Sequence, residues 1–141
     1  NKVNKYTPEG REMIHKKISV NTQMIQYMLN YPVVDRSVEY NDNRISLYVG
    51  QCGKCAVTGE ELTQDNLHCH HKIPRTMGGT DEYKNLILVT KQIHTLIHAT
   101  EFETILETLK SLHLDNKKKM KINKLRQLCG NVDISWESYI F

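Results

Sequence analysis

The sequence predicts an α+β fold, in which two short antiparallel strands and a following helix are flanked by helical segments on both sides. Residues 67–73 and 86–89 have the composition and length of strands, and a turn-rich loop containing Gly78-Gly79 joins them. Thr90 has the side chain of a helix N-cap, and the residues after it predict a helix that runs to about Ala99. Together these segments predict a compact strand–loop–strand–helix unit.

The N-terminal flank predicts two helices. The first begins at Thr7-Pro8-Glu9, where a hydroxyl cap precedes proline at the first helical position, and it ends at Asn30-Tyr31-Pro32. Residues 33–42 are polar and predict a connector. Asn41 or Asp42 then caps a short second helix, which leads into a turn-rich stretch with the knuckle-like Cys52-Gly53-Lys54-Cys55.

The C-terminal flank predicts two more helices. One begins at Thr100 and has apolar residues at helical spacing, namely Phe102, Ile105, Leu106, Leu109 and Leu112. The other spans about 116–129 and ends at Gly130, the usual residue after a helix C-cap. The tail that follows has no pattern that places it.

Composition limits the class of protein. The 141 residues are 39% hydrophobic and 25% charged, which fits one globular domain with or without a helical appendage. No apolar run approaches the roughly 20 residues that span a bilayer, so we expect no membrane partner. The four cysteines are irregularly spaced, which favours a reducing cytosol over a secreted disulfide framework. Because the chain opens at Asn1 rather than Met, we expect it to be part of a longer polypeptide.

A histidine array carries the chemistry. His94 and His98 are four residues apart, so they share one face of the predicted helix. With His70 on the facing strand, they can bind a divalent ion, since imidazole is the commonest metal ligand. His71 then remains to deprotonate water, and the amide of Asn85 can orient the site.

The two adjacent histidines raise a geometric difficulty. Neighbouring residues in a strand point to opposite faces, so His70 and His71 should face away from each other. We therefore expect the backbone to bend or bulge near His71, where the nearby Pro74 favours a break in the strand. His68 has no assigned role, and His15 and His113 are expected at the surface.

This array resembles that of the HNH (His-Asn-His, or ββα-metal) endonucleases. The matching residues are His70-His71-Lys72-Ile73-Pro74, Gly78-Gly79, Asn85-Leu86, His94 and His98. The resemblance implies a ββα-metal core in which His71 is the general base and Asn85 holds it or its loop in register. It also implies that His70, His94 and His98 bind the catalytic ion, with Mg²⁺ or Mn²⁺ for activity and Zn²⁺ or Ni²⁺ as further candidates. The products would carry 5′-phosphate and 3′-hydroxyl ends.

Segments scattered across most of residues 4–131 resemble the C-terminal part of bacterial group II intron reverse transcriptase–maturases. They are Asn4–Arg11, Glu39–Tyr48, His68–Pro74, Gly79–Leu86, Leu96–Thr100 and Asn123–Asn131. The resemblance implies a helical DNA-binding or linker segment over 1–40, an endonuclease domain with C-terminal helices over 41–131, and a tail over 132–141. It further implies a bacterial cytoplasmic protein that nicks double-stranded DNA to prime reverse transcription, with intron RNA bound through the parent protein.

Two features remain open. Cys52 and Cys55 form half of a structural zinc site, but the second cysteine pair of many HNH domains would fall at Thr90 and Ile93 and is missing. Basic side chains could contact nucleic acid by counterion release. They are Lys72 and Arg75 beside the site, and Lys117, Lys118, Lys121 and Lys124 on the last helix.

Two other functions compete with a nuclease. Cys52-x2-Cys55-x12-His68-x2-His71 comes close to a Cys2His2 zinc finger, which would make the chain a non-catalytic nucleic-acid-binding module. That arrangement needs a helix over 60–71 and leaves Asn85, His94 and His98 unexplained. The third possibility is an inactive remnant that only helps its parent protein grip nucleic acid.

Overall fold

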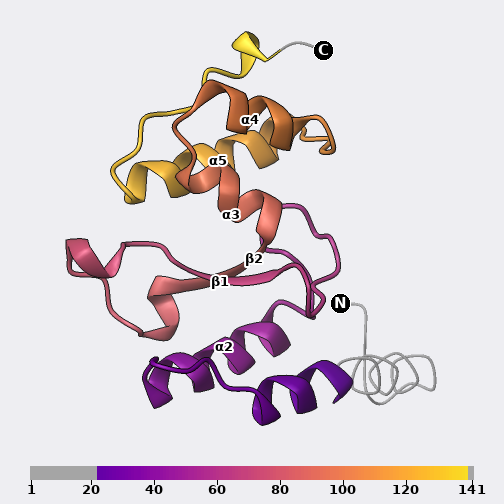
Figure 1. Cartoon of the computed structure of the whole chain (residues 1–141), viewed down its shortest axis with the longest axis vertical. Coiled ribbons are helices and arrows are strands. Elements are labelled where there is room, and N and C mark those ends of the chain that lie inside the picture. The colour runs from indigo at the N-terminus through magenta and orange to yellow at the C-terminus, as the bar shows by residue number, and fades with distance from the viewer. Residues whose placement is uncertain (1–21, 140–141) are drawn as a thin grey trace, which may run out of the picture.

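The computed structural model describes residues 22–139 (Figure 1). The predicted helix start at Thr7-Pro8-Glu9 lies outside these residues. Residues 22–30 are helical, and this first helix ends at Asn30. The predicted end at Asn30-Tyr31-Pro32 is therefore confirmed.

The second helix, α2 (Val38–Gly50), begins earlier than the sequence predicts. Its N-cap is Ser37, whose Oγ accepts a hydrogen bond from the backbone N–H of Tyr40 at 2.9 Å. The predicted cap at Asn41 or Asp42 is therefore wrong. The predicted connector over residues 33–42 is also wrong from residue 38 onward, where α2 begins. Asn41 instead lies inside α2, where its Oδ1 accepts from the Val33 N–H at 2.7 Å and ties down the segment before the helix.

The predicted two-stranded antiparallel sheet is confirmed, and with it the α+β fold class. Strand β1 (Leu67–His71) pairs with β2 (Leu86–Thr90), and the register sets His70 opposite Ile87 and His71 opposite Leu86. The first strand ends two residues before the predicted Ile73. One further backbone bond follows it, from the Lys72 N–H to the Asn85 carbonyl at 2.7 Å.

Three helices follow the sheet. Thr90 caps α3 (Lys91–His98) by accepting from the Ile93 N–H at 3.3 Å, as predicted. Helix α4 (Phe102–Leu109) starts after Glu101, so the predicted start at Thr100 is wrong. Helix α5 (Asn116–Leu128) is followed by Gly130 at φ 82°, a left-handed conformation that favours glycine and confirms the predicted helix end. The tail adds a short 3₁₀ turn at Trp136–Ser138.

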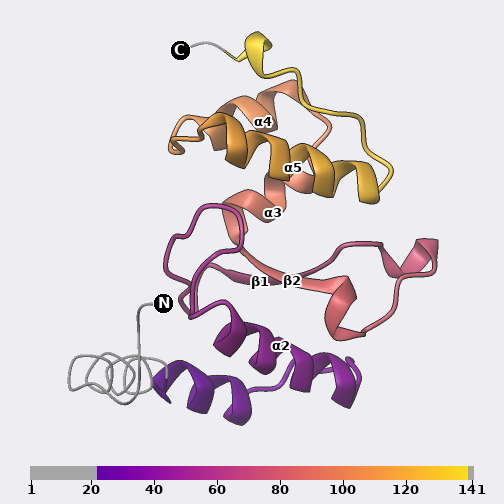
Figure 2. The ribbon, with the colours of Figure 1, turned by 180° about the vertical axis from the view of Figure 1, so that it is seen from behind.

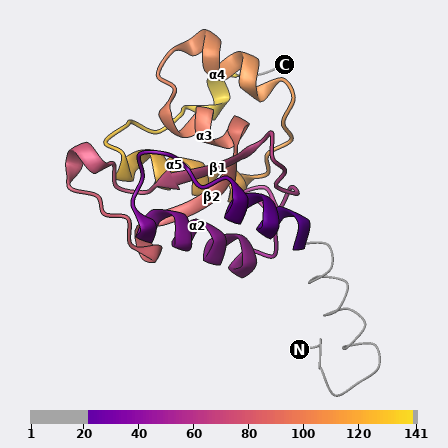
Figure 3. The ribbon, with the colours of Figure 1, turned by 60° about the horizontal axis from the view of Figure 1, so that its bottom comes forward.

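The sheet lies between two helical layers. Figures 1 and 2 show α2 and the preceding helix on one side, and α3, α4 and α5 on the other. Figure 3 shows α2 packed across the strands from below. The core contains fully buried residues of β2, α3 and α5, namely Leu88, Val89, Ile93, Leu96, Ile97 and Ile122. Among the helices of residues 22–139, none combines the length and hydrophobicity that crossing a membrane requires.

Candidate metal centre

Three histidines meet on the α3 face of the sheet. His94 and His98 lie one turn apart on α3, and His70 reaches them from β1. One ring nitrogen from each lies within 4.8 Å of the other two, so the three side chains could hold a metal ion. The ring centroids of His94 and His98 are 4.6 Å apart, and that of His70 is 5.2 and 5.0 Å from them. The predicted convergence of these three residues is therefore seen in the structure.

The surroundings keep these imidazoles neutral. Burial, together with the neighbouring histidines, lowers the pKa of His70 to about 3 and that of His94 to about 4. Burial and then the charge of Arg126 also lower the pKa of His98. Neutral imidazole is the form that binds metal, so the donor set is ready to accept an ion near neutral pH. Three nitrogen donors suit Zn²⁺, Ni²⁺ and similar transition ions, whereas Mg²⁺ prefers oxygen.

Two further side chains adjoin the cluster without belonging to it. The His68 ring stacks on His94 with centroids 5.0 Å apart, and Cys129 Sγ lies 3.7 Å from His70 Nε2. His68 shares the α3 face with His70 because the two are separated by two residues along β1. The alternation of side chains along a strand could therefore have placed His68 beside the cluster from the sequence alone. Nothing in the sequence pattern indicated that Cys129, at the C-terminal end of α5, approaches His70.

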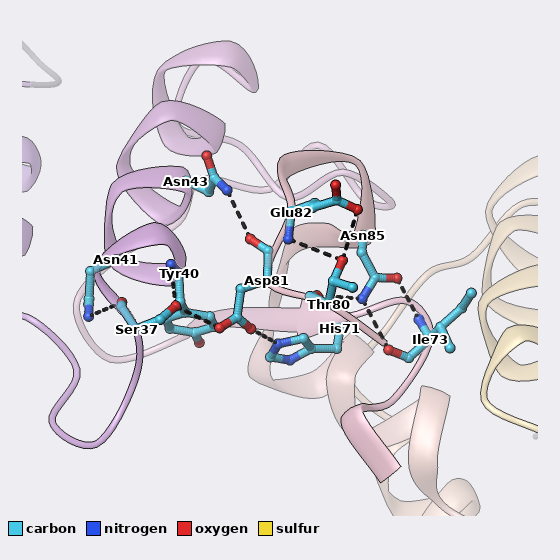
Figure 4. Close-up of polar contacts among 10 residues, drawn as sticks. All are labelled: Ser37, Tyr40, Asn41, Asn43, His71, Ile73, Thr80, Asp81, Glu82 and Asn85. Carbon is cyan, nitrogen blue, oxygen red and sulfur yellow. Dashed lines mark hydrogen bonds and ion pairs between the residues drawn. The ribbon is translucent and has the colours of Figure 1, made fainter. Parts of the chain in front are cut away.

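His71 lies on the opposite face of the sheet, toward α2. The strand pairing continues through His71 and Leu86 to the bond between Lys72 and Asn85, so the side chains alternate normally. The expected bend or bulge near His71 is therefore wrong. The His71 ring stacks on Tyr40 of α2 with centroids 5.5 Å apart, and its Nε2 lies 2.8 Å from Asp81 Oδ1 (Figure 4).

Asn85 closes the loop between the strands. Its Nδ2 donates to the carbonyls of Ile73 at 3.1 Å and Thr80 at 2.8 Å, and its Oδ1 accepts from the Ile73 N–H at 3.0 Å (Figure 4). Asn85 itself is buried. The turn also requires glycine, because a Cβ at Gly79 would collide with the Ile73 carbonyl. The side-chain amide of Asn85 thus holds the two ends of the predicted Gly-Gly loop together, as expected of this residue from the sequence.

The cysteine pair does not assemble a four-ligand site. Cys55 is buried and Cys52 is exposed in the turns after α2. Over residues 22–139, the histidine trio alone brings three or more potential metal ligands this close together. The structural zinc considered for Cys52 and Cys55 therefore gains no third ligand from the described residues.

The zinc-finger alternative fails on geometry. It needs a helix over 60–71, but Leu67–His71 is a strand and no helix occupies the residues before it. His68 and His71 also point to opposite faces, because they are three residues apart in that strand. They cannot bind one ion together, so the finger arrangement is wrong.

Basic residues surround a groove beside the metal centre. It has a volume of about 500 Å³ and lies between the sheet and α5, with an apolar floor that includes Ile87 and Leu125. Lys72, Lys121 and Lys124 line it. Arg75 and Lys117 are exposed, and Lys118 is half-buried. The structure thus brings three of the six predicted contact residues to one groove.

The geometry defines the class of protein first. A β1–β2–α3 unit brings together three imidazoles that could hold a metal ion, which is consistent with the architecture of a ββα-metal core. The model of the HNH endonuclease family matches residues 52–100, which include both strands, α3 and all the histidines of the cluster. Residues 52–100 are therefore similar to an HNH endonuclease domain, and this similarity suggests a nuclease. Searches of curated proteins and of solved structures gave no match.

Proposed function

We propose that this chain is a metal-dependent endonuclease that nicks one strand of double-stranded DNA. His70, His94 and His98 hold the divalent ion, His71 is the general base, and Asn85 keeps the adjoining loop closed. The observation that carries the proposal is the convergence of three neutral imidazoles from β1 and α3 inside the HNH match. These residues supply the ligands and the proton acceptor that phosphodiester hydrolysis needs.

The division of labour follows from chemistry. A bound divalent ion would supply positive charge to the phosphate and to the leaving 3′ oxygen. His71 takes a proton from the attacking water, which makes it a better nucleophile for phosphorus. Cleavage of the bond to the 3′ oxygen leaves 5′-phosphate and 3′-hydroxyl ends.

The opposite orientations of His70 and His71 limit how DNA can approach. His70 and His71 are the last two residues of β1, and their side chains project to opposite faces of the two-stranded sheet. We propose that the scissile phosphate approaches this end of the strand, where the cluster and His71 lie on either side of the backbone. The basic groove lined by Lys72, Lys121 and Lys124 would then hold an adjacent part of the DNA backbone.

The biological setting is proposed from the intron-like segments. In it, the chain is the C-terminal part of a bacterial group II intron-encoded protein. Its nick in the bottom strand of the target would give the 3′ hydroxyl that primes reverse transcription. Intron RNA would reach the site through the parent protein, in the bacterial cytoplasm.

A plasmid-nicking assay tests the activity. The chain is incubated with supercoiled plasmid and Mg²⁺, Mn²⁺, Ni²⁺ or Zn²⁺, and the ends are mapped. We expect nicking with at least one ion, and a loss of about 10²- to 10⁴-fold in His71→Ala. His113→Ala is the matched control, because His113 is exposed and outside the site. Absence of nicking with every ion overturns the nuclease, and a wild-type rate in His71→Ala overturns the assignment of the base.

A further inference from the structure

We propose that α2 is a working part of the nuclease: Asp81, anchored by Ser37, orients His71 and fixes its tautomer, leaving Nδ1 as the proton acceptor. Asp81 and Ser37 are positioning residues in this scheme, since they act through His71. The inference rests on the proposed function, in which His71 is the general base.

The contacts form a continuous chain from helix to base. Asp81 Oδ1 lies 2.8 Å from His71 Nε2, and Ser37 Oγ donates to the other carboxylate oxygen, Oδ2, at 2.6 Å (Figure 4). Asn43 Nδ2 donates to the Asp81 backbone carbonyl at 2.9 Å. Asp81 is thus held by α2 at both its side chain and its backbone.

The chemistry of the carboxylate settles which nitrogen carries the proton. Hydrogen bonds from Ser37 and then from His71 hold the pKa of the Asp81 carboxyl below its ordinary value, so the group is ionised at neutral pH. An ionised carboxylate can only accept hydrogen bonds. His71 Nε2 must therefore donate, which leaves Nδ1 of the neutral ring with a free lone pair.

Two other contacts restrict the ring. Tyr40, which is buried, stacks on His71 with an interplanar angle of 17°. Asn85 bonds the carbonyl of Thr80, the residue immediately before Asp81, and so fixes the carboxylate's position. Ser37, Tyr40 and Asn43 all precede residue 52, where the HNH match begins. The device that orients the base thus lies partly outside the matched domain.

The test compares Asp81→Ala and the isosteric Asp81→Asn with wild type. ¹⁵N–¹H correlation spectra of the Zn²⁺-loaded chain report the His71 tautomer, and nicking kinetics give kcat and KM with the most active ion. We expect the Nε2–H tautomer in wild type and a smaller share of it in both variants, because Ala offers no acceptor and the Asn amide can donate to Nε2 and favour the Nδ1–H form. We expect kcat to fall about 10- to 100-fold in Asp81→Ala, by analogy with the loss of a carboxylate that orients a metal-binding histidine, with KM little changed.

Two controls separate positioning from folding. Glu82→Ala removes the neighbouring acid, which bonds Thr80 rather than His71, and should leave tautomer and kcat unchanged. Ser37→Ala removes the hydroxyl that donates to Asp81 and should lower kcat, whereas Ser37→Thr, which keeps the hydroxyl, should restore it. If Asp81→Ala fails to fold, Asp81→Asn still decides the question.

The possible outcomes distinguish the two proposals. If wild type nicks and His71→Ala does not, yet both Asp81 variants keep the wild-type tautomer and kcat, the positioning role is overturned while the nuclease stands. If wild type nicks with no ion, or His71→Ala nicks normally, the proposed function itself fails.

Discussion

Neighbouring residues in β1 and just after it point to opposite faces of the sheet, and this alternation separates the histidine cluster from His71. His68, His70 and Lys72 face α3 and α5, whereas Cys69 and His71 face α2. The proposed metal ligands therefore lie where burial keeps their imidazoles neutral, while the proposed base has a carboxylate partner. One short strand can separate ion binding from proton transfer because its side chains alternate.

At this scale, Asn85 gives a direct prediction. Asn85→Ala leaves the Ile73 N–H and the carbonyls of Ile73 and Thr80 without their partner. A typical hydrogen bond contributes about 0.5–1.5 kcal/mol net, so the loss of these three should lower the unfolding free energy by about 1.5–4.5 kcal/mol. Nicking should fall as well, because the loop carrying Asp81 loses its closure.

Urea denaturation measures the first effect and the plasmid assay the second. Asn116→Ala serves as the matched control, because Asn116 is exposed at the start of α5. A variant at residue 85 that is as stable as this control would show that the loop does not depend on the amide.

At the scale of elements, local signals in the sequence were sufficient where a cap and its helix are contiguous. Thr90 and Gly130 marked the start of α3 and the end of α5 because each acts within one turn. The start of α2 was missed because Ser37 is followed by residues polar enough to resemble a connector. The spacing of His94 and His98 could likewise be read from the sequence, because both lie on one face of α3. The order of strand and helix then predicted that His70 would approach them.

The contacts of His71 could not be predicted in this way. Its partner Asp81 is ten residues away, across a loop whose path depends on Asn85, and Ser37 lies 44 residues before Asp81. Residues in an irregular loop have no fixed period that would bring an acid to a histidine. A bulge is needed only if His70 and His71 must point to the same face of the sheet, and the structure places them on opposite faces.

Helix α5 and Lys72, the residue after β1, supply the basic side chains of the groove, which gives a prediction about binding. Lys121 and Lys124 are exposed along it. If both contact phosphates, changing both to Gln should weaken DNA binding and reduce the slope of log affinity against log salt by about 1.8. The metal cluster should be unaffected.

Fluorescence anisotropy with duplex DNA over a salt series measures the slope, with His71→Ala as the background to prevent cutting. Lys110→Gln is the matched control, since Lys110 pairs with Glu107 at the end of α4. Equal slopes for the double variant and the control would remove α5 from the DNA interface.

At the scale of the whole molecule, the sheet and helices share a core built mainly from apolar side chains. The buried side chains of β2, α3 and α5 pack directly on one another, and Arg126 bonds the carbonyls of Leu96 and Ala99, each at 2.7 Å. The histidine cluster lies at the edge of this core, with His98 exposed. We therefore expect the fold to persist without an ion, unlike that of a zinc finger, whose metal holds the domain together.

Chelation should accordingly abolish activity without unfolding the chain. We expect EDTA to stop nicking while the far-UV circular dichroism keeps its helical signal, because apolar burial continues to stabilise the fold. Added Zn²⁺ or Ni²⁺ should raise Tm in proportion to ln(1 + [ion]/Kd), since an ion that binds only the folded state stabilises it by mass action. His98→Ala should lose most of that rise, because it removes one of the three donors from an exposed position.

A helical signal that collapses on chelation would instead mean that the metal holds the domain together. A Tm that rises equally in His98→Ala and wild type would place the ion elsewhere.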